Sequence, residues 1–283
     1  MMANVATRPF VMGILNVTPD SFSDGGRFLT PGSAVARGEQ MAAEGADVVD
    51  VGGESSRPGA RPVDEAEELR RVLPVVEGLA GTVRVSIDTM KPAVARAAVA
   101  AGATLVNDVG GELWPLAAEL GAGWVSMHSR GTPRTMQSLT HYDDVVGEVR
   151  ASVLDAALRA RDAGVGEVWV DPGIGFAKTA AQNVALLAAL PELVEAAWAA
   201  GARVLVGTSR KGFLGRYGAP SPDRPLGAES RLEASIAMAV WAMAAGVGMV
   251  RVHDVADTIR AAALVGPGTG STRSPDHAGE ACR

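Results

Sequence analysis

The sequence predicts a single (β/α)8 barrel, and three observations lead to that fold class. Eight short β-branched runs alternate with Ala-rich segments in which apolar residues recur every three or four positions. The chain has 283 residues, close to the roughly 250 residues that one such barrel commonly needs. Because 47% of the residues are hydrophobic and only 4% are aromatic, the core must be built mainly from Val, Leu, Ile and Ala, as in parallel sheets covered by helices.

The eight strand candidates are short runs in which Val, Ile and Leu dominate and a polar or glycine residue marks the end. In chain order, the first four are FVMGILN (10–16), DVVDVGG (47–53), VRVSID (83–88) and TLVND (104–108). The last four are GWVSMH (123–128), EVWVD (167–171), RVLVGTS (203–209) and GMVRVHD (248–254). β-Branched residues pack well on a pleated surface, so these runs favour strands.

The helices expected between the strands are amphipathic segments with apolar residues three and four positions apart. In chain order they cover residues 33–44, 65–80, 91–101, 114–121, 143–163, 180–200, 230–246 and 255–265. Gly and Ala turns such as AAEGAD and WAAGAR end these helices and lead into the next strand. Since each strand is followed by a helix, right-handed crossovers are expected to close the sheet into a barrel.

The polar residues of the strands collect at one end of each strand. The strands and the residues just after them finish at Asn16, Glu54, Asp88, Asn107 with Asp108, His128, Asp171, Ser209 and His253. In (β/α)8 barrels the loops after the carboxyl ends of the strands build the active site. Solvation of loops is the alternative explanation, because connecting segments are often polar. Eight polar ends, with carboxylates and amides repeated among them, exceed what solvation needs and favour an active site.

Composition restricts the classes of function. A net charge of −6 argues against a broad nucleic-acid surface, which needs a basic stripe. The one cysteine, Cys282, excludes an intrachain disulfide and a cysteine-based metal site. The sequence shows no signal peptide and no apolar run of about 18 residues, so we expect a soluble cytoplasmic protein with no membrane association. The barrel domain is expected over 1–265, followed by a disordered tail over 266–283.

Three polar side chains are expected to point into one pocket from the third, fourth and sixth strands. They are Asp88, Asn107 and Asp171. Carboxylates and amides in such a cluster suit a flat polar heterocycle, and a carboxylate accepts two N–H bonds from an aminopyrimidine edge. An ordinary capping or structural role is the alternative for any one of them.

The last strand offers a candidate phosphate site. Arg251 and His253 are two residues apart, so they lie on the same face of the strand, and Asn16 belongs to its neighbour in a closed barrel. Together these side chains form a cationic, donor-rich corner that suits phosphate. Barrel enzymes often bind phosphate beside the seventh and eighth strands, which supports this interpretation. A buried carboxylate paired with Arg251 and His253 is the alternative.

Two further loops carry weaker signals. SRKGFLG (209–215) places a hydroxyl, two cations and glycines at the start of a short helix, which suits an anion but also a solvated surface loop. DPGIGFAKT (171–179) lacks the spacing of a phosphate-binding P-loop, so Asp171 is expected to hold a ligand, Phe176 to form an apolar wall and Lys178 to be solvated.

No pair of nucleophile and base stands out in the sequence. The motifs GxSxG and HExxH are both missing. His128 suits either a general base or a hydrogen-bonded structural residue, and His141 is expected at the surface.

At this point the motifs resemble those of the dihydropteroate synthases. NVTPDSFSDGG, DVGGESSRPGA, SIDT, ND, MH followed by G, P and MQ, DPGIGFAKT, SRKGFLG and RVHDV occur in that order, and the likeness runs from about residue 10 to 265. The resemblance implies a transferase of folate biosynthesis, a family targeted by sulfonamides. It implies condensation of 6-hydroxymethyl-7,8-dihydropterin diphosphate with 4-aminobenzoate, usually with Mg²⁺ and in a homodimer.

The same resemblance implies a role for each matching residue. The pterin would be held by Asp88, Asn107, Asp171 and Lys211. The diphosphate would be held by Asn16, Arg251 and His253, with Asn16 also near the metal. The aminobenzoate would be surrounded by Ser56, Arg57, Pro58, Phe176 and Ser209, and Asp24 would help to order the complex. Met127 would be a further substrate-binding residue. Residues with a catalytic role would be Asp24, Arg57, Lys211, Arg251 and His253.

The chain departs from the usual family pattern in two places. Many members have Thr where this chain has Ser56, and Ser-Gly follows Asn-Asp where this chain has Val109 and then Gly110, Gly111 and Glu112. Ser56 keeps the hydroxyl group, so activity is expected, whereas the effect of the fourth loop is left open. Two rival classes remain: a pterin-binding barrel of the methyltransferase type, and a catalytically silent paralogue.

Overall fold

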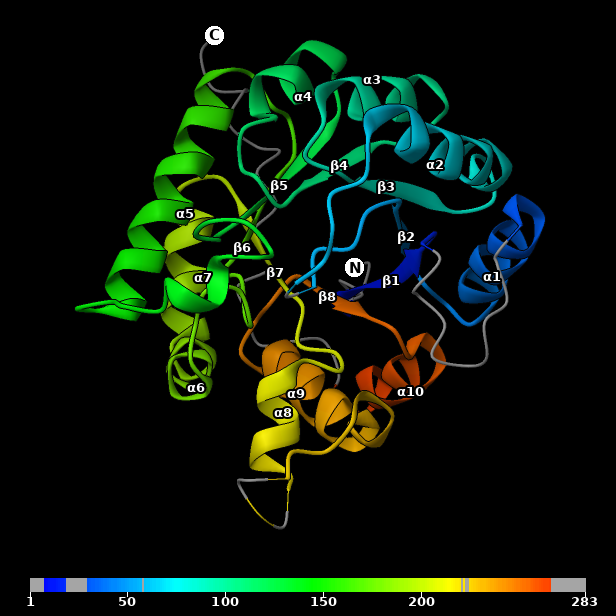
Figure 1. Ribbon diagram of the computed structural model, residues 1–283. Helices are drawn as coiled ribbons and strands as arrows, with labels where there is room; N and C mark the ends of the chain where they lie inside the picture. The colour runs from blue at the N-terminus through cyan, green and yellow to red at the C-terminus, as the bar shows by residue number, and fades with distance from the viewer. Residues whose placement is uncertain (1–7, 19–29, 58, 220, 222–223, 266–283) are drawn as a thin grey trace, which may run out of the picture.

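The computed structural model describes residues 8–18, 30–57, 59–219, 221 and 224–265 (Figure 1). Asp24, Pro58 and the expected tail over 266–283 lie outside the described residues. The remaining candidate residues all lie inside them.

The described part of the chain forms a closed barrel of eight parallel strands in sequence order, which confirms the predicted fold class. Figure 1 shows these strands enclosed by helices. The strands are β1 (Phe10–Asn16), β2 (Val48–Gly52), β3 (Arg84–Asp88), β4 (Leu105–Asp108), β5 (Gly123–Met127), β6 (Val168–Asp171), β7 (Arg203–Val206) and β8 (Met249–Val252). The barrel closes where β8 pairs in parallel with β1.

The helices agree with the predicted segments, with one difference. They are α1 (Pro31–Ala43), α2 (Glu65–Leu79), α3 (Pro92–Ala100), α4 (Trp114–Leu120), α5 (Val145–Asp162), α6 (Ala180–Ala188), α7 (Leu190–Ala199), α8 (Gly212–Tyr217), α9 (Leu232–Ala244) and α10 (Val255–Val265). The single helix expected over 180–200 is two helices, because the chain leaves the helical path at Ala189 and a new helix begins at Leu190, with Pro191 in its first turn.

The interior of the barrel is built from alternate residues of the strands. A lower apolar layer fills the centre: Met12, Val48, Leu105, Val125, Trp169, Leu205 and Met249. Two residues further along β2, β4, β6 and β8, the same face carries a polar group: Asp50, Asn107, Asp171 and Arg251. The period of two therefore places a polar floor directly above an apolar plug.

The amino-terminal end of the barrel, where the strands begin, is closed by ion pairs and by an arginine that lies over an aromatic ring. Glu167 accepts hydrogen bonds from Arg84, Arg203 and the indole Nε1 of Trp169, and the Arg203 guanidinium lies 4.1 Å from the centre of the Trp169 ring. Ligands therefore have access from the opposite end, where the strands finish. No helix within the described ranges is long and apolar enough to cross a membrane.

Candidate active site

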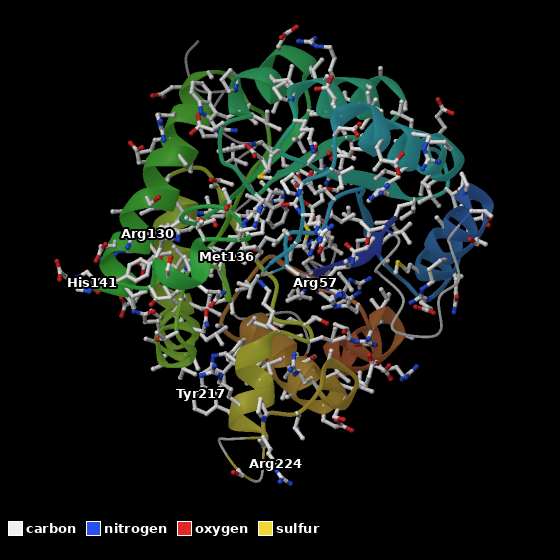
Figure 2. The ribbon with its side chains drawn as sticks, in the orientation of Figure 1. Arg57, Arg130, Met136, His141, Tyr217 and Arg224 are labelled. Atoms are coloured by element: carbon white, nitrogen blue, oxygen red, sulfur yellow. The ribbon has the colours of Figure 1, made fainter. Side chains whose placement is uncertain are left out.

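A large cavity of about 1440 Å³ opens at the carboxyl ends of the strands. Twelve candidate residues from the sequence lie around it: Asn16, Ser56, Arg57, Asp88, Asn107, Met127, Asp171, Phe176, Ser209, Lys211, Arg251 and His253. Figure 2 places Arg57 over the middle of the barrel and His141 at its outer edge. The His141 side chain is 92% exposed, which confirms its surface location.

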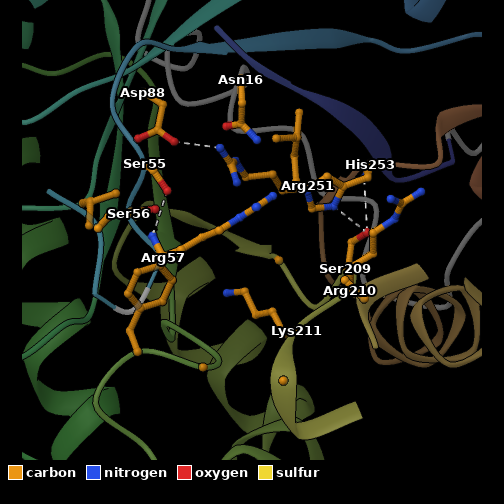
Figure 3. A pocket seen from close by; sticks show the side chains of 18 of the residues that line it. Asn16, Ser55, Ser56, Arg57, Asp88, Ser209, Arg210, Lys211, Arg251 and His253 are labelled. Atoms are coloured by element: carbon orange, nitrogen blue, oxygen red, sulfur yellow. Dashed lines mark hydrogen bonds and ion pairs between the residues drawn. The ribbon is translucent and has the colours of Figure 1, made fainter. Parts of the chain in front are cut away.

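The floor of the cavity is organised around Arg251 of β8. Its Nε donates to Asp50 Oδ2 at 2.6 Å, and its terminal Nη2 donates to Asp88 Oδ2 at 2.7 Å (Figure 3). Asn107 Nδ2 donates to the same Asp50 oxygen at 2.8 Å. Arg251 is therefore paired with buried carboxylates, which was the alternative to a phosphate-binding role. It also lines the cavity, where an anion could reach it.

Asp50 is the residue that the sequence interpretation missed. It lies in the middle of β2, its side chain is fully buried, and its second oxygen Oδ1 has no hydrogen-bond partner among the described residues. The only signal in the sequence is a charged residue inside the apolar run DVVDVGG. A buried carboxylate is costly unless it is paired, so such a residue indicates a cationic partner inside the barrel.

The carboxyl groups of Asp88 and Asp171 are harder to ionise in this pocket than in water. Burial raises the pKa of Asp88 to about 7, opposed by Arg251 and reinforced by Asp50. Burial also raises the pKa of Asp171, opposed by the positive charge of Lys211. A ligand that donates N–H groups to these oxygens would stabilise their charged forms.

Lys211 lies between Asp171 and the Phe176 ring. Its Nζ donates to the carbonyl of Ile174 and lies 4.6 Å from the centre of the Phe176 ring. Burial lowers the pKa of Lys211 to about 8, while Asp171 opposes that shift. The Lys211 stem passes close to Gly175, where an added Cβ would lie 3.0 Å from Lys211 Cδ.

The prediction that Lys178 is solvated is wrong. Lys178 is 4% exposed, and its Nζ donates to the carbonyls of Gly173 and Phe176, each at 3.0 Å, and contacts His128 Nδ1 at 3.0 Å. The loop after β6 folds back over its own lysine, a contact that local sequence does not reveal. Lys178 therefore ties this loop to the end of β5.

His128 is a structural residue rather than a base in this arrangement. Burial lowers its pKa to about 3, with further contributions from Lys178 and Arg130. Because Nδ1 faces the Lys178 ammonium, it accepts a hydrogen bond and holds the lysine in place.

The second loop is anchored at its root by a charge network. Lys91 Nζ donates to both Glu54 and Glu68, and Thr89 Oγ1 donates to the other oxygen of Glu68 at 2.7 Å. Glu68 is 1% exposed, so this network fixes the start of the second loop against α2 and α3. Ser56 and Arg57, which follow, lie at the cavity rim.

The altered fourth loop is held by Asp108. Its carboxylate accepts from the backbone N–H groups of Gly110 and Leu113, at 2.9 and 2.6 Å, and from the indole of Trp124 at 3.1 Å. Gly111 has a φ of +74°, and the space that a Cβ would fill there is open. The loop sequence is therefore compatible with a defined turn beside Asn107.

Comparison with known proteins gives one consistent result. A profile of the family described as pterin binding enzyme matches residues 12–253. The dihydropteroate synthase of Mycobacterium leprae is 49% identical over 268 residues, which cover 90% of this chain and 92% of that protein.

Solved structures agree with the sequence comparison. The Yersinia pestis dihydropteroate synthase with a sulfonamide drug complex has a TM-score of 0.82 at 41% identity and covers 91% of this chain and 93% of its own. The Xanthomonas albilineans dihydropteroate synthase with 4-aminobenzoic acid has a TM-score of 0.81 at 46% identity, covering 91% and 92%. Another structure of the Xanthomonas protein contains 7,8-dihydropteroate, with a TM-score of 0.77, 43% identity and coverage of 91% and 92%.

Proposed function

This chain belongs to the dihydropteroate synthase family of pterin-binding enzymes, and from that premise we propose how its own residues carry out the reaction. The enzyme is a transferase of folate biosynthesis that condenses 6-hydroxymethyl-7,8-dihydropterin diphosphate with 4-aminobenzoate to give 7,8-dihydropteroate and diphosphate. One observation supports this conclusion most directly. The candidate residues for the pterin, the diphosphate and the aminobenzoate line the same cavity.

The pterin binds at the polar floor. Asp88 and Asp171 accept N–H bonds from its aminopyrimidine edge, and Asn107 supplies both a donor and an acceptor. Lys211, beside Asp171 and the Phe176 ring, donates to a ring acceptor. Since these groups stand on four different strands or their loops, the barrel holds them in place before the ligand arrives.

The diphosphate binds beside β8 and β1. Arg251 of β8 and His253, which directly follows β8, both line the cavity, and Asn16 lines it from the end of β1. The described residues contain no cluster of three or more His, Cys, Asp or Glu side chains that would bind a metal by itself.

Mg²⁺ fits this corner when it arrives with the diphosphate. The ion usually takes one or two protein oxygens together with substrate phosphates and water. By the family resemblance, Asn16 Oδ1 would be that protein oxygen. It flanks Gly52 together with Asp88 Oδ2, each 3.7 Å from where a Cβ on Gly52 would lie, so both oxygens adjoin the same space. The bound metal would neutralise charge on the leaving diphosphate.

The aminobenzoate binds nearer to the cavity mouth. Ser56, Arg57, Phe176 and Ser209 all line the cavity, so they combine an apolar wall with hydroxyl and guanidinium donors. Met127 lines the cavity at its floor, in register with Asp171. By the family resemblance, Pro58 adds to this wall and Asp24 orders the first loop over it.

The reaction proceeds by early departure of the diphosphate. The C–O bond breaks and its electron pair leaves with the diphosphate, so a cation forms that is delocalised over the electron-rich pterin. The amine lone pair of 4-aminobenzoate then forms the C–N bond, and the resulting ammonium gives its extra proton to water. This route needs no protein nucleophile, which agrees with the lack of a nucleophile and base pair in the sequence. Arg251 stabilises the developing charge on the leaving group.

A diphosphate-release assay tests the function directly. Release should require both the pterin diphosphate and 4-aminobenzoate, and 7,8-dihydropteroate should form in equal amount. Transfer of a methyl group from methyltetrahydrofolate to a corrinoid protein would instead establish the methyltransferase alternative. Pterin binding without any turnover would establish the silent paralogue.

We also propose that the enzyme is a cytoplasmic homodimer. Trp198 of α7 and Trp241 of α9 are 44% and 54% exposed, so both offer apolar area for a contact between subunits, and Trp241 Nε1 donates to the carbonyl of Leu187 in α6. Sedimentation equilibrium should give twice the chain mass, and Trp198→Glu with Trp241→Glu should give a monomer.

A further inference from the structure

Ser209 makes two contacts with the same histidine. Its Oγ accepts a hydrogen bond from the backbone N–H of His253 at 3.2 Å and lies 3.0 Å from the imidazole Nδ1 (Figure 3). The two residues stand at the ends of neighbouring strands β7 and β8, and both line the cavity. Ser209 therefore contacts the ring of the residue proposed to bind the diphosphate.

The hydrogen count at this contact determines which ring nitrogen is protonated. A serine hydroxyl has one hydrogen to donate and two lone pairs to accept with. One lone pair is occupied by the His253 backbone N–H. If Nδ1–H also donated to Oγ, the hydroxyl hydrogen would have no acceptor among the described residues, although Ser209 is only 6% exposed. If Oγ–H donates to Nδ1, every group is satisfied and the ring proton lies on Nε2.

The position of the ring proton matters because the His253 imidazole is neutral and has only one N–H group to donate. Burial lowers the pKa of His253 to about 3, with further contributions from Arg251, Arg210 and Arg57. The free enzyme therefore contains a neutral imidazole with one N–H group at pH 7. A phosphate oxygen needs a donor, so a bare Nε2 facing it would repel it, whereas Nε2–H would bind it.

The backbone around Ser209 is fixed independently of any ligand. Arg210 has a φ of +58°, an unfavourable conformation for a side chain with a Cβ. That conformation is held by Asp254, which accepts from the Arg210 guanidinium at 2.6 and 3.1 Å, and by Ser235, which accepts from the Arg210 backbone N–H at 2.9 Å. Ser209 is thus presented to His253 by a loop whose next residue is itself bonded to Asp254.

We infer that Ser209 is a positioning residue that fixes His253 in the Nε2–H tautomer, so that the ring presents a donor to the diphosphate. The identity of the anion rests on the proposed function, whereas the tautomer does not. The hydroxyl also stands beside the expected aminobenzoate site, so a single side chain adjoins both subsites.

Nitrogen-15 NMR of histidine-labelled, ligand-free protein tests the tautomer. The chain has four histidines, and a His253→Gln spectrum identifies the resonances of His253. At pH 7 we expect a protonated Nε2 and an unprotonated Nδ1 whose shift shows an accepted hydrogen bond. A protonated Nδ1 would overturn the inference, whatever the enzyme's activity.

Three variants distinguish the effect of the Ser209 hydroxyl on His253 from the effect of loop packing. Ser209→Ala should move the Nδ1 resonance further downfield, because its hydrogen bond is lost, and Ser209→Thr should restore it. Ser235→Ala removes a hydroxyl that supports the same loop through the Arg210 N–H but does not touch the imidazole, so the His253 signals should move much less than in Ser209→Ala. Equal displacement in Ser235→Ala and Ser209→Ala would show that loop packing sets the ring, and would overturn the inference.

Titration with inorganic diphosphate and Mg²⁺ tests the consequence. Ser209→Ala should weaken diphosphate binding about fivefold or more, and Ser209→Thr should recover most of it, while the affinity for a pterin without phosphates stays unchanged. Unchanged diphosphate binding in Ser209→Ala would overturn the proposed role of the tautomer. Failure of the enzyme to release diphosphate from the pterin substrate would contradict the proposed function alone.

Discussion

At the scale of single residues, the two pterin carboxylates are expected to be indispensable. Asp88→Ala and Asp171→Ala should abolish turnover while the protein stays folded, because the polar edge of the pterin then loses its acceptors. Each unpaired group should cost about 1–3 kcal/mol of binding or more. Calorimetry with the pterin diphosphate and circular dichroism measure the two effects, and full activity in either folded variant would disprove the assignment.

Asp50 is expected to act through the two side chains that it holds. Asp50→Ala leaves Arg251 with one carboxylate and Asn107 without its acceptor, and removing one partner of a buried pair typically costs about 3–5 kcal/mol of folding free energy. Asp50→Asn keeps the shape and should cost less.

Ser86→Ala is the matched control for Asp50. Ser86 is the register neighbour of Asp50 on β3, is fully buried, and has no hydrogen-bond partner among the described residues. Denaturant unfolding should show a large loss for Asp50→Ala and a loss near zero for Ser86→Ala. Similar losses in both variants would show that depth in the barrel, and not the Arg251 contact, is responsible.

At the scale of elements, the loop after β6 depends on the buried lysine. Burial lowers the pKa of Lys178 in the folded protein to about 7, from 10.5 for a lysine in water. Between these values the unfolded chain binds more protons at this site than the native protein, so Lys178 makes stability rise with pH over this window. Unfolding free energies measured from pH 7 to 10 should rise less steeply in Lys178→Met than in the natural protein; an identical slope would contradict the buried, shifted lysine.

The same loop needs a residue without a side chain at Gly173. Its φ is +67°, and an added Cβ would lie 1.8 Å from the carbonyl oxygen of His128. Gly173→Ala should therefore displace the loop that carries Asp171 and Phe176, and reduce activity at least tenfold. Gly164 has a φ of +92° with open space around its Cβ position, so Gly164→Ala should cost only about 1 kcal/mol of stability and no activity. Equal activities would refute the steric argument.

At the scale of the whole molecule, we expect the substrates to bind in order. The amine can attack only after the diphosphate substrate is seated, and the first two loops are expected to complete the aminobenzoate site around it. Titrating 4-aminobenzoate with and without pterin plus Mg²⁺-diphosphate should show a gain of about 1–3 kcal/mol in the amine's binding free energy. Equal affinity in both titrations would contradict the ordered mechanism.

The architecture could be inferred from the sequence, and so could the end of the barrel at which the polar side chains gather. The period of two in the strands and of three to four in the helices reports which face of each element is buried, so the barrel and its polar end could be inferred without coordinates. For the same reason Asp88, Asn107 and Asp171 could be placed in one pocket, since each stands at the carboxyl end of a strand.

Only the tertiary structure decided the partners of the buried charges. Asp50 and Arg251 are 201 residues apart in the chain, and Lys178 reaches His128 across 50 residues. Charge alone predicts solvation for Lys178, because an unpaired ammonium is costly to bury. The folded loop supplies carbonyl oxygens and an imidazole nitrogen that offset this cost, and these acceptors come together only when the barrel closes.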